Sequence, residues 1–166
     1  MPNERLVIKP RSFLFAALLA GCGGSTAGTV APSNSAKGAV ESFMQAVADS
    51  NLTQMANFWG SAGGPAARTG QPPDYERRIA IMHAYLRNES HRIVSDTPEG
   101  GGTRHALQVE IRRQLCSWIV PFTAIKLGDG SWIVSQVDVT AAGNPARPCV
   151  PGGEQDTTRQ DTTRQE

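Results

Sequence analysis

The chain has 166 residues, with 16 Lys and Arg against 15 Asp and Glu, and 39 % of its residues are hydrophobic. This length suits one modest domain and leaves no room for a large multidomain enzyme. The formal net charge of +1 excludes a general nucleic-acid binder, which needs a strongly basic face. The 17 Gly and 11 Pro residues indicate loops and loose ends around that domain.

The N-terminus has the pattern of a secretory leader. A segment with three basic residues, 5–11, is followed by the uncharged and mostly apolar run 12–20. That run is too short to cross a membrane as a helix, which needs about 20 residues, but it has the length of the apolar region of a signal peptide. Two small residues then precede Cys22, as a signal-peptidase site requires.

Leu19-Ala20-Gly21-Cys22 resembles the lipobox of bacterial lipoproteins. The resemblance implies that Cys22 receives a diacylglyceryl group on its sulfur, that residues 1–21 are removed, and that the new amine is acylated. Two or three acyl chains hold a protein on a membrane surface without spanning it. Gly23, where inner-membrane lipoproteins tend to have Asp, implies the periplasmic face of the outer membrane rather than the inner one. The alternative is a buried N-terminal helix with an ordinary cysteine.

Composition divides the mature chain into three parts. Residues 22–34 are rich in Gly, Ser, Thr, Ala and Pro and read as a flexible tether, because they lack apolar groups to offset the entropy of ordering. A domain is expected over 35–140. Residues 141–166 read as a disordered tail, in which Gln-Asp-Thr-Thr-Arg occurs at 155–159 and again at 160–164.

Helical spacing dominates the first half of the domain. Ser35 is expected to cap a helix whose apolar stripe has the i, i+3, i+4, i+7 pattern: Val40, Phe43, Met44 and Val47. A second, shorter helix is expected over 52–59, and the Gly- and Pro-rich segment 60–73 is expected to be a loop. Asp74 is a plausible cap for a third helix that ends near Asn88.

The second half changes to the alternating period of strands. A strand over 91–97 is followed by a turn at 99–102 and by a strand in which Leu107, Val109 and Ile111 face one way. In this second strand Gln108, Glu110 and Arg112 are expected to face solvent.

Two more strands complete the predicted sheet. The strand 116–126 contains Pro121, which implies an edge position or a bulge. A tight turn at 128–130 leads into the last strand, 132–139, in which Ile133, Val137 and Val139 are expected to face one way and Asp138 the other.

This order predicts an α+β domain with about three N-terminal helices packed on a curved four-stranded antiparallel sheet. The helix pair 39–59 and the hairpin 128–134 with its Trp resemble the nuclear-transport-factor-2-like superfamily, the cone-shaped fold of ketosteroid isomerase and the polyketide cyclases. The resemblance implies an apolar cavity in the cone, an Asp or Tyr inside it in the enzymes, and frequent dimers through the sheet. The long segment 60–73 departs from the compact form.

Cys116 and Cys149 remain as a pair if Cys22 carries lipid, and an exported chain meets oxidising conditions in which disulfides persist. A disulfide across about 34 residues would stabilise the domain by about 3–4 kcal/mol in the chain-entropy model. The alternative is that Cys116 is a small buried apolar residue.

The candidates for lining a ligand pocket are Trp118, Phe122, Trp132 and Tyr75. Core packing is the default interpretation of these residues. Asp138 and Tyr85 are further candidates for lining a pocket, but no catalytic residue, cofactor or metal is assigned. If a metal did bind, His91, His105 and Asp96 would be the first suspects, provided that their strands pair.

The function that these patterns favour is that of a lipid-anchored cell-envelope protein whose non-enzymatic domain binds a small apolar ligand or an envelope protein. One alternative is an isomerase- or cyclase-type enzyme, which needs an ionisable residue buried in the cone. The other is a structural subunit that forms homodimers through its sheet.

Overall fold

The computed structural model describes residues 31–147 and 149 of the chain. The predicted leader, the first part of the tether and the repeated pentapeptide lie outside the described residues. The helices and strands are α1 (Ala36–Ala48), α2 (Leu52–Phe58), β1 (Gly60–Ser61), β2 (Gly64–Pro65), α3 (Ala66–Thr69), α4 (Tyr75–Leu86), β3 (Ser90–Glu99), β4 (Arg104–Arg113), β5 (Cys116–Lys126) and β6 (Trp132–Val137), with the short 3-10 helices η1 (Gly100–Gly102) and η2 (Val139–Ala142).

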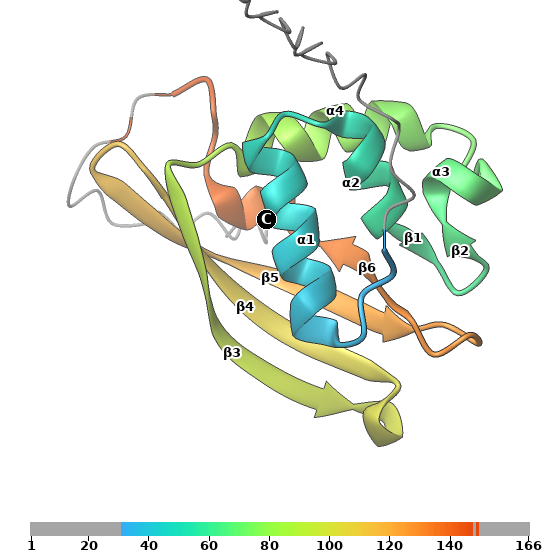
Figure 1. Ribbon diagram of the computed structural model, residues 1–166. Helices are drawn as coiled ribbons and strands as arrows, with labels where there is room; N and C mark the ends of the chain where they lie inside the picture. Colours follow the sequence, from blue (N-terminus) through green and yellow to red (C-terminus); the bar gives the residue numbers. More distant parts are fainter. Residues whose placement is uncertain (1–30, 148, 150–166) are drawn as a thin grey trace, which may run out of the picture.

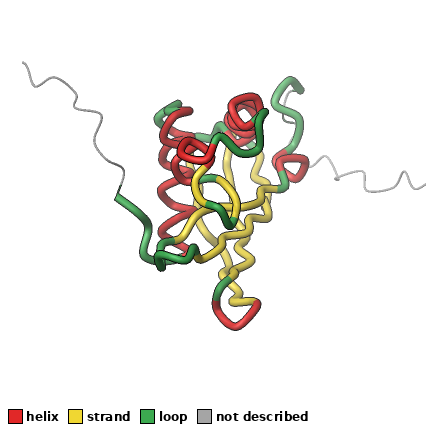
Figure 2. The backbone as a smooth tube through the Cα atoms, turned by 90° about the vertical axis from the view of Figure 1, so that its right-hand side faces the viewer, coloured by secondary structure: helices red, strands yellow, loops and turns green. Residues whose placement is uncertain are grey.

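Strands β3 to β6 form one antiparallel sheet in the order β3-β4-β5-β6, so each strand pairs with the next along the chain. Helix α1 lies across one face of this sheet and contacts all four strands (Figure 1). The side view shows the α-helices on one side of the sheet, whereas the 3-10 helix η1 lies at the tip of the β3–β4 hairpin (Figure 2). The predicted α+β class with a four-stranded antiparallel sheet is therefore confirmed.

The core lies between α1 and the facing side of the sheet. Leu107, Val109 and Ile111 alternate along β4 with no exposed surface, as the period of two predicts. From α1, Phe43 packs edge-on against Phe122 of β5, with 6.1 Å between the ring centroids. Burial of each such side chain contributes roughly 1.5–3 kcal/mol, so this layer fixes α1 on the sheet.

Of the two predicted helix caps, one forms and the other does not. Ser35 caps α1 as predicted, because its Oγ accepts a hydrogen bond of 3.0 Å from the Gly38 N–H. Asp74 precedes α4 but does not cap it with its side chain. Its carboxylate instead accepts a hydrogen bond of 2.9 Å from Nε of Arg78, one turn further along the helix.

The segment 60–73 is more than the loop that its Gly and Pro residues predicted. It contains the two-stranded hairpin β1–β2 and the short helix α3, so residues 31–147 hold four α-helices rather than about three. Pro65 precedes α3, where a missing N–H costs nothing, and Gly70 ends the helix with a φ of 65°. Turn residues here start and stop a helical turn instead of preventing one.

The last strand is shorter than predicted and carries a bulge. Its register with β5 shifts between Thr123 and Ala124, so that Ser135 is the extra residue of β6. The bulge reverses the alternation, and Val134 rather than Ile133 belongs to the buried core cluster. The expectation that Ile133, Val137 and Val139 face one way along an unbroken strand was wrong.

Pro121 lies just outside the part of β5 that pairs with β6. Strand β5 lies inside the sheet, but β6 pairs with it only over residues 122–126. The carbonyl of Pro121 accepts a hydrogen bond of 3.0 Å from the N–H of Asp138, on the side away from β4. Because the N–H and C=O of a strand residue point to the same side, the missing N–H removes no hydrogen bond to β4.

Candidate functional site

The four aromatic candidates do not come together around one cavity. Phe122 is buried in the core, and Trp118 is half-buried with the guanidinium of Arg113 stacked 4.8 Å from its ring centroid. Tyr75 lies beside α2 at the edge of a separate depression, while Trp132 lines a different pocket. Trp132 therefore leads to the best candidate site among the four.

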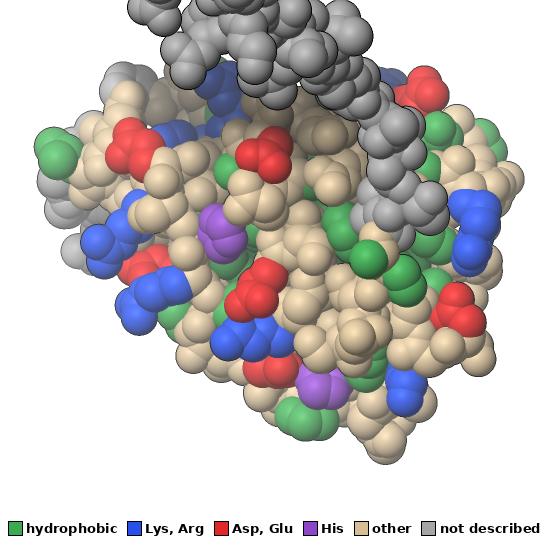
Figure 3. All heavy atoms as spheres, viewed as in Figure 1, with side chains coloured by type: hydrophobic (Ala, Val, Ile, Leu, Met, Phe, Trp, Pro, Cys, Tyr) green, Lys and Arg blue, Asp and Glu red, His purple; other side chains and the backbone are tan. Residues whose placement is uncertain are grey.

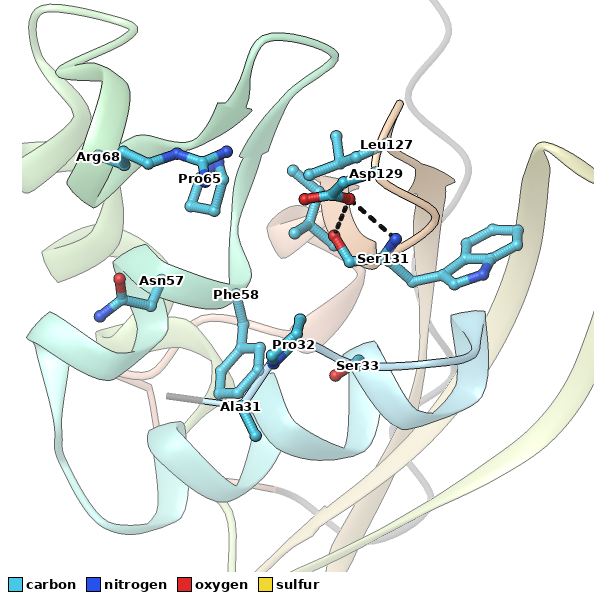
Figure 4. A pocket seen from close by; sticks show the side chains of 12 residues that line it. Ala31, Pro32, Ser33, Asn57, Phe58, Pro65, Arg68, Leu127, Asp129 and Ser131 are labelled. Carbon is cyan, nitrogen blue, oxygen red and sulfur yellow. Dashed lines mark hydrogen bonds between the residues drawn. The ribbon is translucent and has the colours of Figure 1, made fainter. Parts of the chain in front are cut away.

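This Trp132 pocket has a volume of about 380 Å³ and opens between the β1–β2 hairpin, α2, α3 and the β5–β6 turn (Figure 4). Its lining combines apolar and polar side chains: Ala31, Pro32, Ser33, Asn57, Phe58, Pro65, Arg68, Leu127, Asp129, Ser131, Trp132 and Ile133.

Two backbone contacts build the pocket on the free edge of β6. The N–H of Trp132 donates a hydrogen bond of 2.9 Å to the carbonyl of Ser33, which brings the start of the domain against this strand. Trp59, just after α2, bridges Val134 in the parallel sense. The pocket lies between these two attachments, at the place where the chain enters the fold.

The pocket carries charges of both signs. Figure 4 shows Arg68 extending from α3 and Asp129 on the opposite wall with Ser131. Asp129 Oδ1 accepts hydrogen bonds from the Ser131 N–H at 2.9 Å and from its Oγ at 2.6 Å. These hydrogen bonds lower the pKa of Asp129, and the positive charge of Arg68 adds to the effect. Asp129 is therefore a carboxylate at neutral pH.

Gly64 makes room for the Arg68 side chain. A Cβ at this position would lie 2.6 Å from Nη2 of Arg68, and the φ of +124° is one that L side chains rarely adopt. An apolar lining with one cation and one anion suits a small molecule with an apolar body and a polar end. The sequence alone did not reveal Arg68 or Asp129, because the first lies in a segment read as a loop and the second in a turn.

The histidines suspected as metal ligands lie at opposite ends of the β3–β4 ladder. His91 is opposite Ile111, whereas His105 is opposite Pro98. His105 Nδ1 instead lies 2.5 Å from Asp96 Oδ1, and its ring packs edge-on against Trp132 at 4.9 Å. Within residues 31–147 and 149, no group of three or more His, Cys, Asp or Glu residues could hold a metal ion.

Asp138 and Tyr85 are both occupied by the local structure. Asp138 lies after β6 rather than within the last strand, and it caps η2 by accepting a hydrogen bond of 3.1 Å from the Thr140 N–H. The side chain of Tyr85 is partly buried against the core cluster, and its main-chain carbonyl accepts a hydrogen bond of 3.4 Å from Arg113. Neither residue lines the Trp132 pocket.

Glu110 on the outer side of the sheet was expected to face solvent, but only 8 % of it is exposed. Arg92 from β3 forms an ion pair with it, and Arg112 lies 3.7 Å away on the same strand. The hydrogen bond from Arg92 lowers the pKa of Glu110. Figure 3 shows acidic and basic side chains next to each other over the part of the surface where Figure 1 draws β3. Long arginine side chains thus cover an outward-pointing carboxylate.

The structure joins Cys116 to Cys149, with 6.0 Å between the Cα atoms. This separation is within the range of natural disulfides. The disulfide itself stays a prediction, which a count of free thiols by mass tests. Cys22 lies outside the described residues. In the described part of the chain, no helix is long and apolar enough to span a membrane.

Compared with models of protein families, with curated proteins and with solved structures, the chain matched none. The resemblances to lipoproteins and to the nuclear-transport-factor-2-like superfamily therefore stay predictions from the sequence.

Proposed function

We propose that the protein is a lipid-anchored protein of the cell envelope, whose cone-like domain of the nuclear-transport-factor-2-like kind binds a small amphiphilic molecule in the Trp132 pocket. The lipobox residues 19–22 support the anchor. The pocket supports the binding role, and it is the single observation on which that role depends. An anchor of two or three acyl chains would hold the domain on a membrane surface, and Gly23 in place of Asp supports the periplasmic face of the outer membrane.

The position of the pocket fits this role. Ala31, Pro32 and Ser33 line it, and they belong to the last part of the predicted tether 22–34. The stretch from Cys22 to Ala31 spans about 30 Å when fully extended. A domain on such a tether presents its pocket close to the lipid surface, where molecules with an apolar body and a polar end are concentrated.

The chemistry of the lining indicates how such a molecule would lie. Its apolar part would contact Phe58, Leu127 and Ile133, and its polar end would reach Arg68 or Asp129. Burial of the apolar part supplies the driving force, roughly 25 cal/mol per Å² removed from water. The opposite charges then select a head group that can pair with one of them.

The isomerase-type alternative needs an ionisable side chain buried in the cone. In the described residues, the buried core cluster between helices and sheet is apolar. Among the described residues, the buried ionisable side chain is that of Glu110. It alternates with the core residues of β4 and therefore points to the outer face of the sheet, away from the core cluster. The apolar core of the described residues therefore supports the binding role over the isomerase-type one.

A dansyl-labelled undecanoic acid tests the binding role. The full chain with Cys22→Ser should increase the fluorescence of this probe in a saturable way. Asn57→Trp, which places a large ring in the pocket from α2, should weaken binding about tenfold. Gln54→Trp is the matched control, because it lies on the same helix but does not line the pocket.

Two results would refute the assignment. One is the absence of saturable binding by the native chain; the other is equal binding by the Asn57→Trp and Gln54→Trp variants.

A further inference from the structure

A second pocket lies at the other end of β5. Its volume is about 340 Å³, and it opens between the end of α4 and the β4–β5 turn. The residues that line this Arg113 pocket are Ala84, Arg87, Asn88, Glu89, Arg113, Gln114 and Pro145. The sequence alone predicts no binding role for any of them.

Arg113 is held rigidly at the inner side of the pocket. Its Nη2 donates a hydrogen bond of 2.7 Å to the carbonyl of Ala142, and its Nη1 donates one of 3.4 Å to the carbonyl of Tyr85. Trp118 stacks against the guanidinium at 4.8 Å. A guanidinium has five N–H donors, so the three contacts orient the group and leave donors for a ligand.

Arg87 brings a second positive charge to the same pocket. It follows the last residue of α4, and it takes part in none of the ion pairs among the described residues. Burial, together with the positive charge of Arg87, lowers the pKa of Arg113. The two cations therefore repel each other across a cavity, and an anion between them would remove that repulsion.

One carboxylate also lines the pocket. Glu89 Oε1 accepts a hydrogen bond of 3.2 Å from the N–H of Gln114, so one of its oxygens is engaged with the β4–β5 turn. Two guanidinium groups against one carboxylate leave the lining with a net positive charge. The side-chain amides of Asn88 and Gln114 add neutral hydrogen-bonding groups around the two cations.

We propose that the Arg113 pocket binds a small oxyanion, a carboxylate or a phosphate, between Arg87 and Arg113. Planar guanidinium groups bind both anions through paired hydrogen bonds, and a preoriented group loses little entropy on binding. The site is separate from the Trp132 pocket, because the two cavities share no lining residue. The inference therefore stands or falls independently of the proposed function.

The test uses the full chain purified in detergent, with ¹⁵N-labelled arginine side chains observed by NMR. Inorganic phosphate and succinate are titrated separately at constant ionic strength, which distinguishes the two anion types. The Nε–H signal of Arg113 should shift in a saturable way with at least one of them. Sodium chloride at the same ionic strength should leave the signal in place.

Arg87→Gln should weaken anion binding about tenfold, because one of the two cations is lost. Arg113→Lys, observed through the Nε–H signal of Arg87, should weaken anion binding as well, since lysine keeps the charge but loses the paired geometry. Arg77→Gln, an exposed change within α4, is the matched control and should bind as the native chain does. The proposal is overturned if neither anion gives a saturable shift, or if Arg87→Gln and Arg77→Gln bind equally.

Discussion

The two ends of β5 carry pockets of different character. At Lys126 the strand pairs with Trp132, beside the pocket that the entering chain helps to line. At Cys116 it pairs with Arg113, beside the pocket with two arginines. An extended strand of this length separates the two by about 33 Å.

The two ends of β5 are attached to the rest of the domain by different kinds of contact. The Trp132 end is closed by backbone pairing, with Ser33 and Trp59 bridging the free edge of β6. At the Arg113 end the contacts are made by side chains: the guanidinium of Arg113 stacks on Trp118, and Cys116 is linked to Cys149. One end can therefore be disturbed through the backbone and the other through side chains, and each change should leave the opposite pocket intact.

The largest stability effect is expected from the disulfide. Replacing Cys116 and Cys149 by serine should reduce the free energy of unfolding by about 3–4 kcal/mol, because the closed loop spans 33 residues. Denaturant unfolding measures this change. Binding of the dansyl probe in the Trp132 pocket should persist, whereas anion binding in the Arg113 pocket should weaken. Unchanged stability, or a native chain with two free thiols by mass, would contradict the link.

The backbone of the β1–β2 hairpin offers the complementary change at the other end. A Cβ at Gly60 would lie 2.3 Å from the carbonyl oxygen of Gly64, so Gly60→Ala should push the hairpin apart. We expect a loss of about 1–3 kcal/mol, as for other overpacking changes, together with weaker probe binding. Gly63→Ala is the control, because its nearest contact is an ordinary 3.7 Å to Ser61 Oγ. Equal effects of the two substitutions would disprove the reason given.

The smallest effect is a pH dependence away from both pockets. The pKa of Glu110 is lowered from 4.5, so its ion pair stabilises the fold above the unfolded pKa and the contribution is lost as the pH falls through the folded pKa. At neutral pH, Glu110→Gln should therefore be less stable than the native chain, and the gap should close in acid. Urea unfolding at several pH values measures the difference in stability between the two chains. A difference that widens in acid would contradict the prediction.

Much of this fold was predictable because its signals are local. The alternation of Leu107, Val109 and Ile111 identified β4, and Ser35 identified the start of α1. The sequence could not show that Ser135 forms a bulge, since the bulge depends on the register with β5.

The candidate site was predictable only in one residue, Trp132. Arg68 and Asp129 come together through the pairing of distant segments, and single-sequence periodicity holds no information on such pairing. Likewise, the burial of Glu110 requires Arg92 from the neighbouring strand. Residues whose role depends on a partner far along the chain were the ones missed.

The central claim is that an acylated Cys22 holds this binding domain on a membrane surface. The direct test is the mass of the mature chain and its partition between membrane and soluble fractions, for the native sequence and for Cys22→Ser. The account predicts that the native chain begins at Cys22, carries the added mass of acyl groups and sediments with membranes, whereas Cys22→Ser keeps its leader and gains no acyl mass. Identical processing and mass, apart from the substitution itself, would contradict it.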